Sequence, residues 1–487
     1  MKPEQAGIHS KYIKQYIEKL EKKHLAMHNM LIAKGDDILF ETYWEPFHAE
    51  YNHRMYSVSK SIVAIAIGFL EQDGKISLDD YVGDYFPEEI ENSSDEYLRK
   101  TTIKHMLMMS TARAPKKGGW WFGTEDRVKY YFEDSDVVSR PSGTIWDYDS
   151  TGSFILGALV ERVSGMKFMD YLREKLFDKI GVSKGAYCLE CPGGHSWGDS
   201  AVLCTQRDLF KIARFVMNKG KWNGEQILNE AYLTAAASKL IDNNMRDIKA
   251  WDSYGYGYQI WQTFQNSFLF FGMGCQIALG IPEKDLIFIC NGDAQGNEYG
   301  MQIVLENFFE IIADNMESSP IAEEGGYDEL MQTTKHLKLA TAIGEKQSGL
   351  ESKIHGVTYE MDDNPMGITK MRFEFDKDGG TWYYTNAQGH KELRFGRCEN
   401  IFGDFPEEGY SDMIGGQVAP GHKYHCATSA AWSSETELYI KVQIIDKYFG
   451  NLTVRVGFRD DVIGVSMHKV AEAFLETYQG FAGGRAI

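Results

Sequence analysis

The segment that most constrains this chain is residues 62–70, Ile-Val-Ala-Ile-Ala-Ile-Gly-Phe-Leu, which contains no polar side chain. A helix that is apolar on every face has to be enclosed by other parts of the protein, so this one is expected at the centre of a domain. The run is far shorter than the roughly 20 apolar residues that a membrane-spanning helix needs. The segment therefore predicts a buried central helix and argues against a membrane protein.

A serine and a lysine stand directly before this segment. Ser57 and Lys60 are three residues apart, a spacing that puts two side chains on one face of a helix. A serine hydroxyl is a poor nucleophile at neutral pH, and a lysine amine can take its proton when burial or a second cation lowers the pKa of the amine. The simpler interpretation is an ordinary helix start, with the serine as N-cap and the lysine in solvent. The motif alone leaves both interpretations open, although the apolar segment favours a lysine near the core.

Size, charge and cysteine content narrow the class of protein. A chain of 487 residues is too long for one hydrophobic core, so two or three domains are expected. The net charge of −19 disfavours nucleic acid and anionic membranes as partners. The first residues carry no apolar signal-peptide core, and seven scattered cysteines suit free thiols in a reducing compartment. We therefore expect a cytoplasmic protein without a disulfide framework.

The pattern of apolar residues divides the chain. Residues 27–43 predict a β-hairpin, and three short apolar strands follow much later, at residues 268–289. These strands can share one antiparallel sheet if the mostly helical residues 78–240 are inserted between them. The expected first domain is therefore residues 1–316. A linker with a short helix is expected to follow over residues 317–345.

Further motifs occur in the order of a known family. Tyr148 and Ser150 form a Tyr-x-Ser element before a helical pattern, and Gly272 follows a late strand. Together with the serine–lysine motif, these residues resemble those of the serine β-lactamase-like hydrolases, which include class C β-lactamases, D-stereospecific peptidases and esterases. The resemblance covers about residues 4–315 and implies an α/β (α+β) fold of the β-lactamase/transpeptidase type, with helices flanking an antiparallel sheet. Four more segments are similar to the family: residues 54–61, 70–80, 102–107 and 254–261.

The resemblance implies a role for each motif residue. Ser57 would be the acyl-accepting nucleophile, and Lys60 with Tyr148 would form the general base–acid pair. The backbone N–H groups of Ser57 and Met273 would form the oxyanion hole. Ser150 stands where the family more often has asparagine, and it would hydrogen-bond the lysine or the substrate. The family pattern implies no metal and no organic cofactor.

The third motif departs from the family in a way that bears on the substrate. β-Lactamases have a lysine, and several peptidases a histidine, where this chain has Phe270-Phe271-Gly272. Because no cation is present to dock a substrate carboxylate, we expect a small ester or amide with an apolar group, or a short D-amino-acid peptide, in preference to a β-lactam. Phe271 and Gly272 are the expected substrate-binding residues of this motif. Trp121, in an aromatic Gly-rich loop, is either a wall of the pocket or a packing residue.

Two other motifs are compatible with different chemistry. Residues 194–198, Gly-His-Ser-Trp-Gly, fit the G-x-S-x-G pattern of α/β-hydrolases, but the strand before and the helix after that such a serine needs are not predicted. Ser196 is therefore expected in a loop. Cys188, Cys191 and His195 fall short of the four ligands of a structural zinc site, so free thiols are the better interpretation.

The alternating strands of residues 346–487 predict a small β-barrel or sandwich without a site of its own, and the barrel is the expected form. This part resembles, more weakly, the lipocalin-like barrel appended to some D-aminopeptidases. Three functions are open for it: to cover the active site, to pack between subunits of a homo-oligomer, or simply to stabilise the chain.

The sequence thus predicts a serine hydrolase that acts through an acyl-enzyme on a small ester, amide or short peptide. One alternative is β-lactamase or DD-carboxypeptidase activity. Another is a catalytically silent binding or assembly protein on the same fold. The intact set of Ser57, Lys60 and Tyr148 argues against a silent protein, which has no need of all three.

Overall fold

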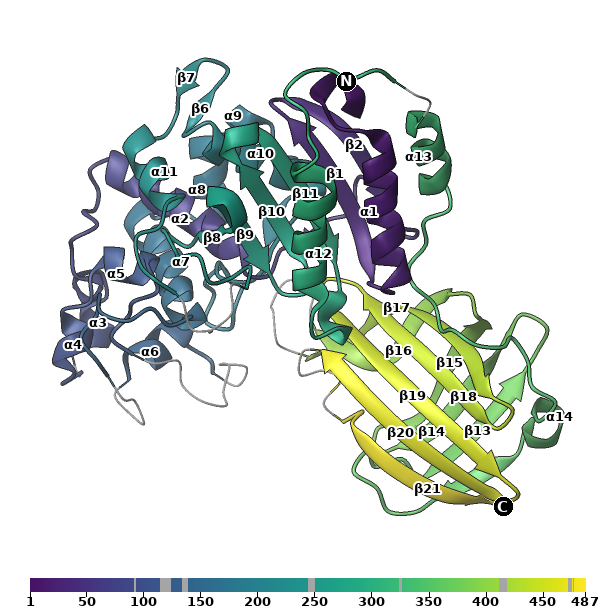
Figure 1. Ribbon diagram of the computed structural model, residues 1–487. Coiled ribbons are helices and arrows are strands. Elements are labelled where there is room, and N and C mark those ends of the chain that lie inside the picture. Colours follow the sequence, from purple (N-terminus) through teal and green to yellow (C-terminus); the bar gives the residue numbers. More distant parts are fainter. Residues whose placement is uncertain are drawn as a thin grey trace. The chain divides into compact units, whose positions relative to one another are not determined.

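The computed structural model describes residues 1–91, 93–113, 124–133, 139–243, 250–323, 326–410, 418–471, 475 and 477–487. These residues form two compact units, whose elements are labelled in Figure 1. The first unit comprises Met1–Gly292 and Tyr299–Lys338, and the second comprises Asp293–Glu298, Leu339–Ser411 and Val418–Ile487. Trp121 lies outside the described residues, so its place in a pocket wall stays a prediction.

The first unit is built on a six-stranded antiparallel sheet with the strand order β2-β1-β11-β10-β9-β8. The pairing of β1 with β11 joins the two ends of the unit and sets Met30 opposite Cys290. The expected hairpin and the expected late strands therefore share one sheet, which confirms the predicted fold class. The strands are β1 (Met27–Lys34), β2 (Asp37–Tyr43), β8 (Trp261–Thr263), β9 (Ser267–Gly272), β10 (Gln276–Ile281) and β11 (Leu286–Gly292).

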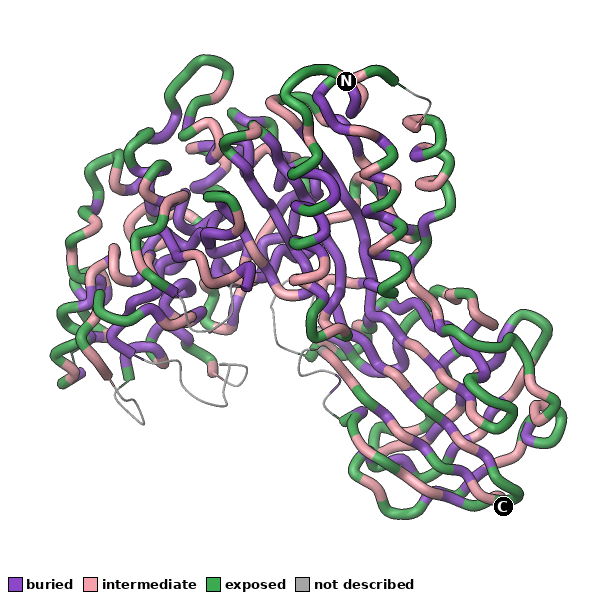
Figure 2. The backbone as a smooth tube through the Cα atoms, in the orientation of Figure 1, coloured by how far each residue is buried: buried purple, intermediate pink, exposed green. Residues whose placement is uncertain are grey.

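Burial explains why these apolar segments are strands. β10 and β11 are buried along their whole length, as short continuous apolar runs in the middle of a sheet are expected to be. Figure 2 shows the same burial along the strands of the sheet. On one face, α1 (Ser10–Lys22) and α12 (Gly300–Phe308) pack together, with the ring of Tyr16 edge-on to those of Phe288 and Phe308.

The expected central helix is α2 (Val58–Gln72), which is buried from Val58 to Leu70. It packs against β9 and β10 of the sheet, and also against α7 (Ser150–Ser164) and α11 (Glu230–Ala236). A helix without a polar face is stable only in such an enclosure. Because the enclosure begins at the first turn, the polar side chains of that turn are screened from water as well.

A small three-stranded sheet connects distant parts of the helical region. β3 (His53–Arg54) pairs with β5 (Val202–Cys204), which also pairs with β4 (Tyr187–Cys188). Because β3 leads into α2, this sheet brings residues near position 200 to the first turn of that helix. The other described helices and strands of the unit are α3 (Pro87–Ile90), α4 (Glu96–Arg99), α5 (Ile103–Leu107), α6 (Arg127–Phe132), α8 (Phe168–Leu172), α9 (Asp178–Ile180), α10 (Gln206–Met217), β6 (Lys221–Trp222), β7 (Glu225–Gln226) and α13 (Gly326–Thr334). Among the helices that the structure describes, none has both the length and the apolar character of a membrane span.

The second unit is a β-barrel, as predicted, and the barrel is closed. Nine of its described strands form a ring in the order β15-β14-β13-β12-β21-β20-β19-β18-β17, and a parallel pairing of β15 with β17 closes it. β16 pairs with β17 as an additional strand. Closure leaves the ring without a free edge. The elements are α14 (Glu351–Ile354), β12 (Thr358–Met361), β13 (Lys370–Phe375), β14 (Gly379–Asn386), β15 (Gly389–Arg397), β16 (Ile401–Tyr410), β17 (Val418–Ser434), β18 (Glu437–Ile445), β19 (Phe449–Arg459), β20 (Val462–Ala471) and β21 (Gly480–Ala486).

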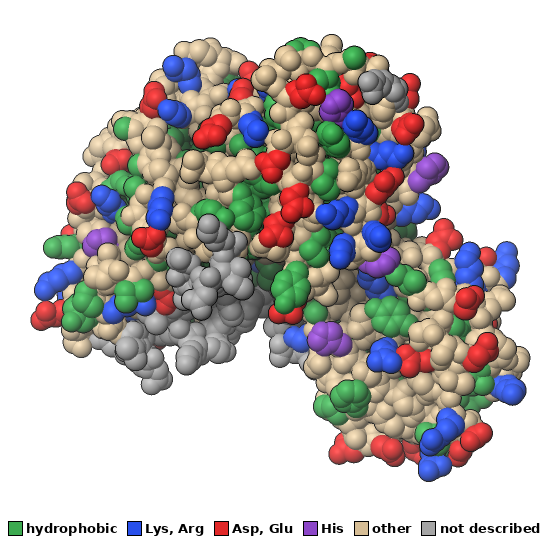
Figure 3. All heavy atoms as spheres, viewed as in Figure 1, with side chains coloured by type: hydrophobic (Ala, Val, Ile, Leu, Met, Phe, Trp, Pro, Cys, Tyr) green, Lys and Arg blue, Asp and Glu red, His purple; other side chains and the backbone are tan. Residues whose placement is uncertain are grey.

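Charged side chains are scattered over the surface of each unit. Figure 3 shows acidic and basic side chains interspersed on the visible face of both. Some form exposed ion pairs, such as Lys100 with Glu96 in the first unit and Arg485 with Asp461 in the second. Exposed pairs of this kind contribute only about 0–1 kcal/mol each to stability, so the fold rests on its buried apolar residues.

Candidate active site

The chain enters α2 through a strained turn that presents one serine. Tyr56 adopts a φ of 46°, in the left-handed region that residues with a side chain rarely occupy. Ser57 follows at the N-cap position of α2 and is half-buried, but its side chain makes no capping hydrogen bond. Strain of this kind often accompanies functional positions. The turn leaves the serine hydroxyl available to other partners.

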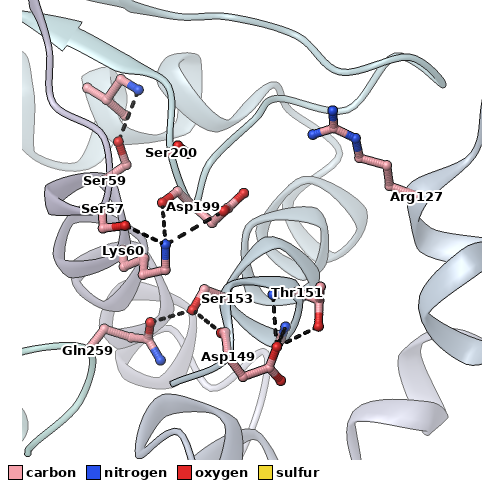
Figure 4. Close-up of polar contacts among 12 residues, drawn as sticks. Ser57, Ser59, Lys60, Arg127, Asp149, Thr151, Ser153, Asp199, Ser200 and Gln259 are labelled. Atoms are coloured by element: carbon pink, nitrogen blue, oxygen red, sulfur yellow. Dashed lines mark hydrogen bonds and ion pairs between the residues drawn. The ribbon is translucent and has the colours of Figure 1, made fainter. Parts of the chain in front are cut away.

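Lys60 lies in the first turn of α2, with only 2% of its side chain exposed. Its Nζ atom donates hydrogen bonds to Ser57 Oγ at 2.9 Å and to the backbone carbonyl oxygen of Asp199 at 2.8 Å. Figure 4 shows the amine pointing toward both residues. The hydroxyl and the amine are therefore within reach of direct proton transfer. The alternative of a capping serine with a solvated lysine does not describe this helix start.

Asp199 is a site residue that the sequence analysis did not identify. Its carboxylate oxygen Oδ2 lies 3.6 Å from Lys60 Nζ, and its side chain is fully buried. Burial raises the pKa of this carboxyl, and the positive charge of Lys60 is the largest effect that opposes the rise. No local pattern marks the residue, because its position depends on the pairing of β3 with β5.

Tyr148 approaches Lys60 from the start of α7. Lys60 Nζ lies 5.3 Å from the centroid of the Tyr148 ring, and the ring stacks on Trp261 with 5.8 Å between centroids. Within the described contacts, Tyr148 thus meets the lysine through its ring. The next residue, Asp149, caps α7 by accepting hydrogen bonds from the backbone N–H groups of Thr151 at 2.9 Å and Gly152 at 3.0 Å. This cap fixes the direction in which the chain carries the tyrosine.

Ser150 begins α7 and is buried. The hydrogen bonds described for Lys60 go to Ser57 and Asp199, so the expected contact between Ser150 and the lysine is not among them. The alternative expectation, that Ser150 hydrogen-bonds the substrate, stays a prediction.

Gln259 joins the two helices that carry the site. Its φ is 55°, and its backbone carbonyl accepts a hydrogen bond from Ser61 Oγ of α2 at 2.7 Å. Its side-chain oxygen accepts from Ser153 Oγ of α7 at 2.6 Å, and its Nε2 donates to the carbonyl of Met106 at 2.9 Å. A buried amide with these contacts holds α2 and α7 at a fixed separation. Sequence periodicity gives no signal for such a residue.

The end of β9 closes the site from the side of the sheet. A Cβ atom on Gly272 would lie 2.2 Å from the carbonyl oxygen of Met55 and 3.2 Å from the backbone nitrogen of Ser57. Only glycine permits this approach. It brings the residue that follows, Met273, into the neighbourhood of the Ser57 N–H, as a shared oxyanion site requires. Their binding of an oxyanion stays a prediction.

An aromatic cluster extends from Tyr148 to the third motif. Phe271 packs against Trp251 with ring centroids 4.6 Å apart, and Trp251 lies 5.8 Å from Trp261, the stacking partner of Tyr148. Phe270 is fully buried and contacts Phe268. Side chains alternate across a strand, so of the two phenylalanines it is Phe271 that joins the cluster beside the site.

The competing motifs have other contacts. Ser196 donates a hydrogen bond to Glu161 Oε1 at 2.7 Å, and His195 Nδ1 lies 2.8 Å from Glu161 Oε2. The histidine therefore pairs with the glutamate and does not act on the serine. Cys191 Sγ accepts a hydrogen bond from Arg127 Nη1 at 2.8 Å. Within the described ranges, no three His, Cys, Asp or Glu side chains are grouped to hold a metal ion.

The fold is of the β-lactamase/transpeptidase type, and a comparison of the sequence with family profiles agrees with it. A profile described as Beta-lactamase matches residues 13–291, and the chain belongs to this family. It is 23% identical over 252 residues to the 6-aminohexanoate-dimer hydrolase of Paenarthrobacter ureafaciens, a match that covers 48% of this chain and 63% of that protein. It is 27% identical over 192 residues to penicillin-binding protein 4* of Bacillus subtilis (strain 168), covering 36% and 41% respectively. The chain thus spans less than two thirds of the length of these relatives.

A solved structure resembles both units. The octameric penicillin-binding protein homologue from Pyrococcus abyssi has a TM-score of 0.50 and 16% sequence identity, with 98% of this chain and 99% of that chain covered. At this identity the likeness establishes the fold alone. That fold is a β-lactamase/transpeptidase-like unit followed by a C-terminal barrel.

Proposed function

We propose that this protein is a serine hydrolase that acts through an acyl-enzyme on a small ester or amide. The observation that carries the proposal is the 2.9 Å contact between Lys60 Nζ and Ser57 Oγ at the head of an enclosed helix. A buried amine beside a half-exposed hydroxyl can activate a serine without a histidine.

The proposed reaction uses each motif residue in turn. Ser57 Oγ attacks the carbonyl carbon of the substrate, and its proton passes to the pair of Lys60 and Tyr148. The carbonyl oxygen becomes an oxyanion, which the backbone N–H groups of Ser57 and Met273 bind. The pair then gives the proton to the leaving group, and an acyl-enzyme remains on Ser57. Water releases the acyl group by the same route.

The aromatic cluster supports an apolar substrate. The Phe270-Phe271-Gly272 motif offers no cation where β-lactamases have the lysine that docks the substrate carboxylate, and such a charge-assisted hydrogen bond contributes about 1.5–3 kcal/mol. Its lack corresponds to roughly a tenfold to hundredfold loss of rate. We therefore expect short acyl esters to be hydrolysed well and penicillins poorly. The Paenarthrobacter relative, by its name, hydrolyses a dimer of 6-aminohexanoate, which supports including unbranched amides among the substrates.

Covalent labelling tests the proposal. We expect a fluorophosphonate probe to modify Ser57, as located by peptide mass spectrometry, and Ser57→Ala to abolish both labelling and turnover of p-nitrophenyl acetate. Ser196→Ala is the matched control and should keep both, because Ser196 is bound to Glu161. Labelling at Ser196, or turnover that survives in Ser57→Ala, would contradict the assignment.

Two alternatives have their own readouts. The Bacillus relative is named a penicillin-binding protein, so nitrocefin and penicillin turnover should be measured beside the best ester. Comparable rates would favour β-lactamase or DD-carboxypeptidase chemistry. A folded protein with neither label nor turnover would favour a silent binding or assembly protein. The Pyrococcus homologue is described as octameric, and light scattering would test the expected homo-oligomer here.

A further inference from the structure

The Lys60 amine has a second partner besides the nucleophile. The backbone carbonyl oxygen of Asp199 accepts a hydrogen bond from Nζ at 2.8 Å, and carboxylate oxygen Oδ2 of the same residue lies 3.6 Å from Nζ. Ser57 Oγ is the third neighbour, at 2.9 Å. Carbonyl and carboxylate oxygens only accept hydrogen bonds. The Asp199 carbonyl oxygen therefore accepts a hydrogen bond from the amine on one side, with the carboxylate close enough for an ion pair, and the amine keeps its contact with Ser57 for the reaction.

The segment that carries Asp199 is fixed to the start of α2. The backbone N–H of Met55 donates to the carbonyl of Val202 at 2.8 Å, and the N–H of Val202 donates to Ser59 Oγ at 3.1 Å. These bonds lie on both sides of the nucleophile in the sequence and extend the β3–β5 pairing. Asp199 cannot move away from the first turn of α2 unless they break.

Two glycines allow this segment to pass between α2 and α7. A Cβ atom on Gly198 would lie 3.2 Å from Val63 Cγ2 of α2 and 3.6 Å from the Cα atom of Gly157 of α7. This close packing encloses the next residue, Asp199, whose side chain has 0% exposure. No other described residue donates a hydrogen bond to its carboxylate oxygens, and only the backbone N–H of Asp199 itself favours the charged form in this way. A buried carboxylate with so few donors depends on a nearby positive charge.

The charges around this carboxylate come from several elements. Burial raises the pKa of the Asp199 carboxyl, and three cations oppose that rise, Lys60 most strongly, followed by Arg127 and Arg54. Arg127 stands apart from the lysine in Figure 4, whereas the Lys60 amine directly contacts Ser57. Among the described residues, the titratable and charged groups that face Asp199 or Lys60 are Arg127 of α6, Arg54 of β3, Cys188 of β4, Cys191 in the loop after β4, and Tyr148 before α7.

We propose that Asp199 is a positioning residue, which aims the Lys60 amine at Ser57 and stabilises its protonated form between the steps of the reaction. This inference rests on the function proposed for Ser57. With the carboxylate in place, the proton taken from Ser57 stays on the amine until Tyr148 or the leaving group receives it. Without the carboxylate, the amine keeps that proton less well.

The variant Asp199→Asn tests the role of the charge, because it keeps the size of the side chain. We expect kcat for p-nitrophenyl acetate to fall more than KM changes. We also expect a change in the plot of kcat/KM against pH. The limb that reports the Lys60 amine should move to lower pH by about one to three pH units, because losing an opposite charge at such a distance usually has an effect of this size. Limbs that stay in place, or that move to higher pH, would overturn the proposal.

Glu161→Gln is the matched control. It removes a carboxylate that holds the same loop through Ser196 and His195, and its described partners do not include Lys60. We expect its pH profile to match that of the unmodified protein. If the limb of the pH profile moves equally far in this control, then the loop, and not the charge of Asp199, sets the pH dependence.

A stability measurement keeps the test decisive if Asp199→Asn does not fold. Lys60→Met removes the cation that acts most strongly on the buried carboxylate, whereas Lys60→Met/Asp199→Asn removes both charges, so the double variant should melt several degrees higher at pH 8. Equal melting temperatures would contradict the pairing. The fluorophosphonate label separates the two proposals: an unlabelled Ser57 contradicts the hydrolase function, and a labelled Ser57 with an unchanged Asp199→Asn profile contradicts only this inference.

Discussion

α2 and α7 both begin with a residue that can cap a helix, and they use it differently. At α7, the Asp149 carboxylate accepts hydrogen bonds from the first backbone N–H groups, as an N-cap does. At α2, Ser57 occupies the same position, but its hydroxyl contacts Lys60. The two helix starts lie beside one another, because Lys60 meets the ring of Tyr148.

The difference shows how a fold can leave a polar group free for chemistry. A lost N-cap costs about 0.5–2 kcal/mol of stability. α2 tolerates this because it is buried from Val58 to Leu70, whereas α7 uses its cap to fix Tyr148. One helix start therefore carries the proposed nucleophile and the other holds the proposed acid–base partner in place.

Removing the hydroxyl of Ser57 should have the largest effect on activity and almost none on stability. We expect Ser57→Ala to lower kcat/KM for p-nitrophenyl acetate by about 10⁴-fold or more, since the covalent step is lost. Its melting temperature should stay close to that of the unmodified protein, because the hydroxyl does not cap α2. A large drop in the melting temperature would mean that Ser57 does stabilise the helix.

Lys60 and Tyr148 should behave as one unit. General acid–base groups contribute about 10²–10⁴-fold to a rate, and groups that act together show losses that do not multiply. We expect Lys60→Ala, Tyr148→Phe and the double variant to lose similar amounts of kcat/KM on one ester. Losses that multiply would show two independent groups, and a nearly silent Tyr148→Phe would make Tyr148 a packing residue.

Gly272→Ala should displace the strand end from the helix start. The added Cβ atom would lie 2.2 Å from the Met55 carbonyl oxygen, so β9 must retreat from the Ser57 N–H. We expect an activity loss of about 10²–10³-fold, the effect of losing one oxyanion donor. Gly464→Ala is the control, since a Cβ atom there meets open space and activity should persist.

Asp149→Ala, at the start of α7, should give the smallest effect of these variants. Its carboxylate caps α7 and also accepts a hydrogen bond from Thr111 Oγ1 at 3.0 Å. We expect the free energy of unfolding to fall by about 0.5–2 kcal/mol, measured by urea denaturation beside Ser57→Ala. If Ser57→Ala proves the more destabilising of the two, the proposed difference between the helix starts is wrong.

The layout of the sheet could be predicted because short apolar runs mark strands. The hairpin of β1 and β2 and the late strands β9, β10 and β11 do share one sheet. The closing of the barrel could not be predicted, because alternation shows which residues face inward and not which strands pair. The parallel contact of Gly396 with Ser429, between β15 and β17, is of this second kind.

The same distinction applies to the site. The contact of Ser57 with Lys60 follows from helical spacing, which is a local property. Asp199 and Gln259 were missed because they reach the site by tertiary contacts. For Asp199 this is the β3–β5 pairing, and for Gln259 it is a left-handed backbone whose carbonyl bonds to α2 and whose side chain bonds to α7 and α5.

The pairing of β1 with β11 also means that β1 has to wait for its partner strand while the chain is being synthesised. Met30 leaves the ribosome long before its partner Cys290, and at about 5–20 residues per second the delay is on the order of tens of seconds. Throughout that interval the inner edge of the β1–β2 hairpin has no strand beside it. An unpaired, apolar edge is a template for wrong association. The nascent chain should therefore depend on ribosome-bound chaperones until β11 emerges.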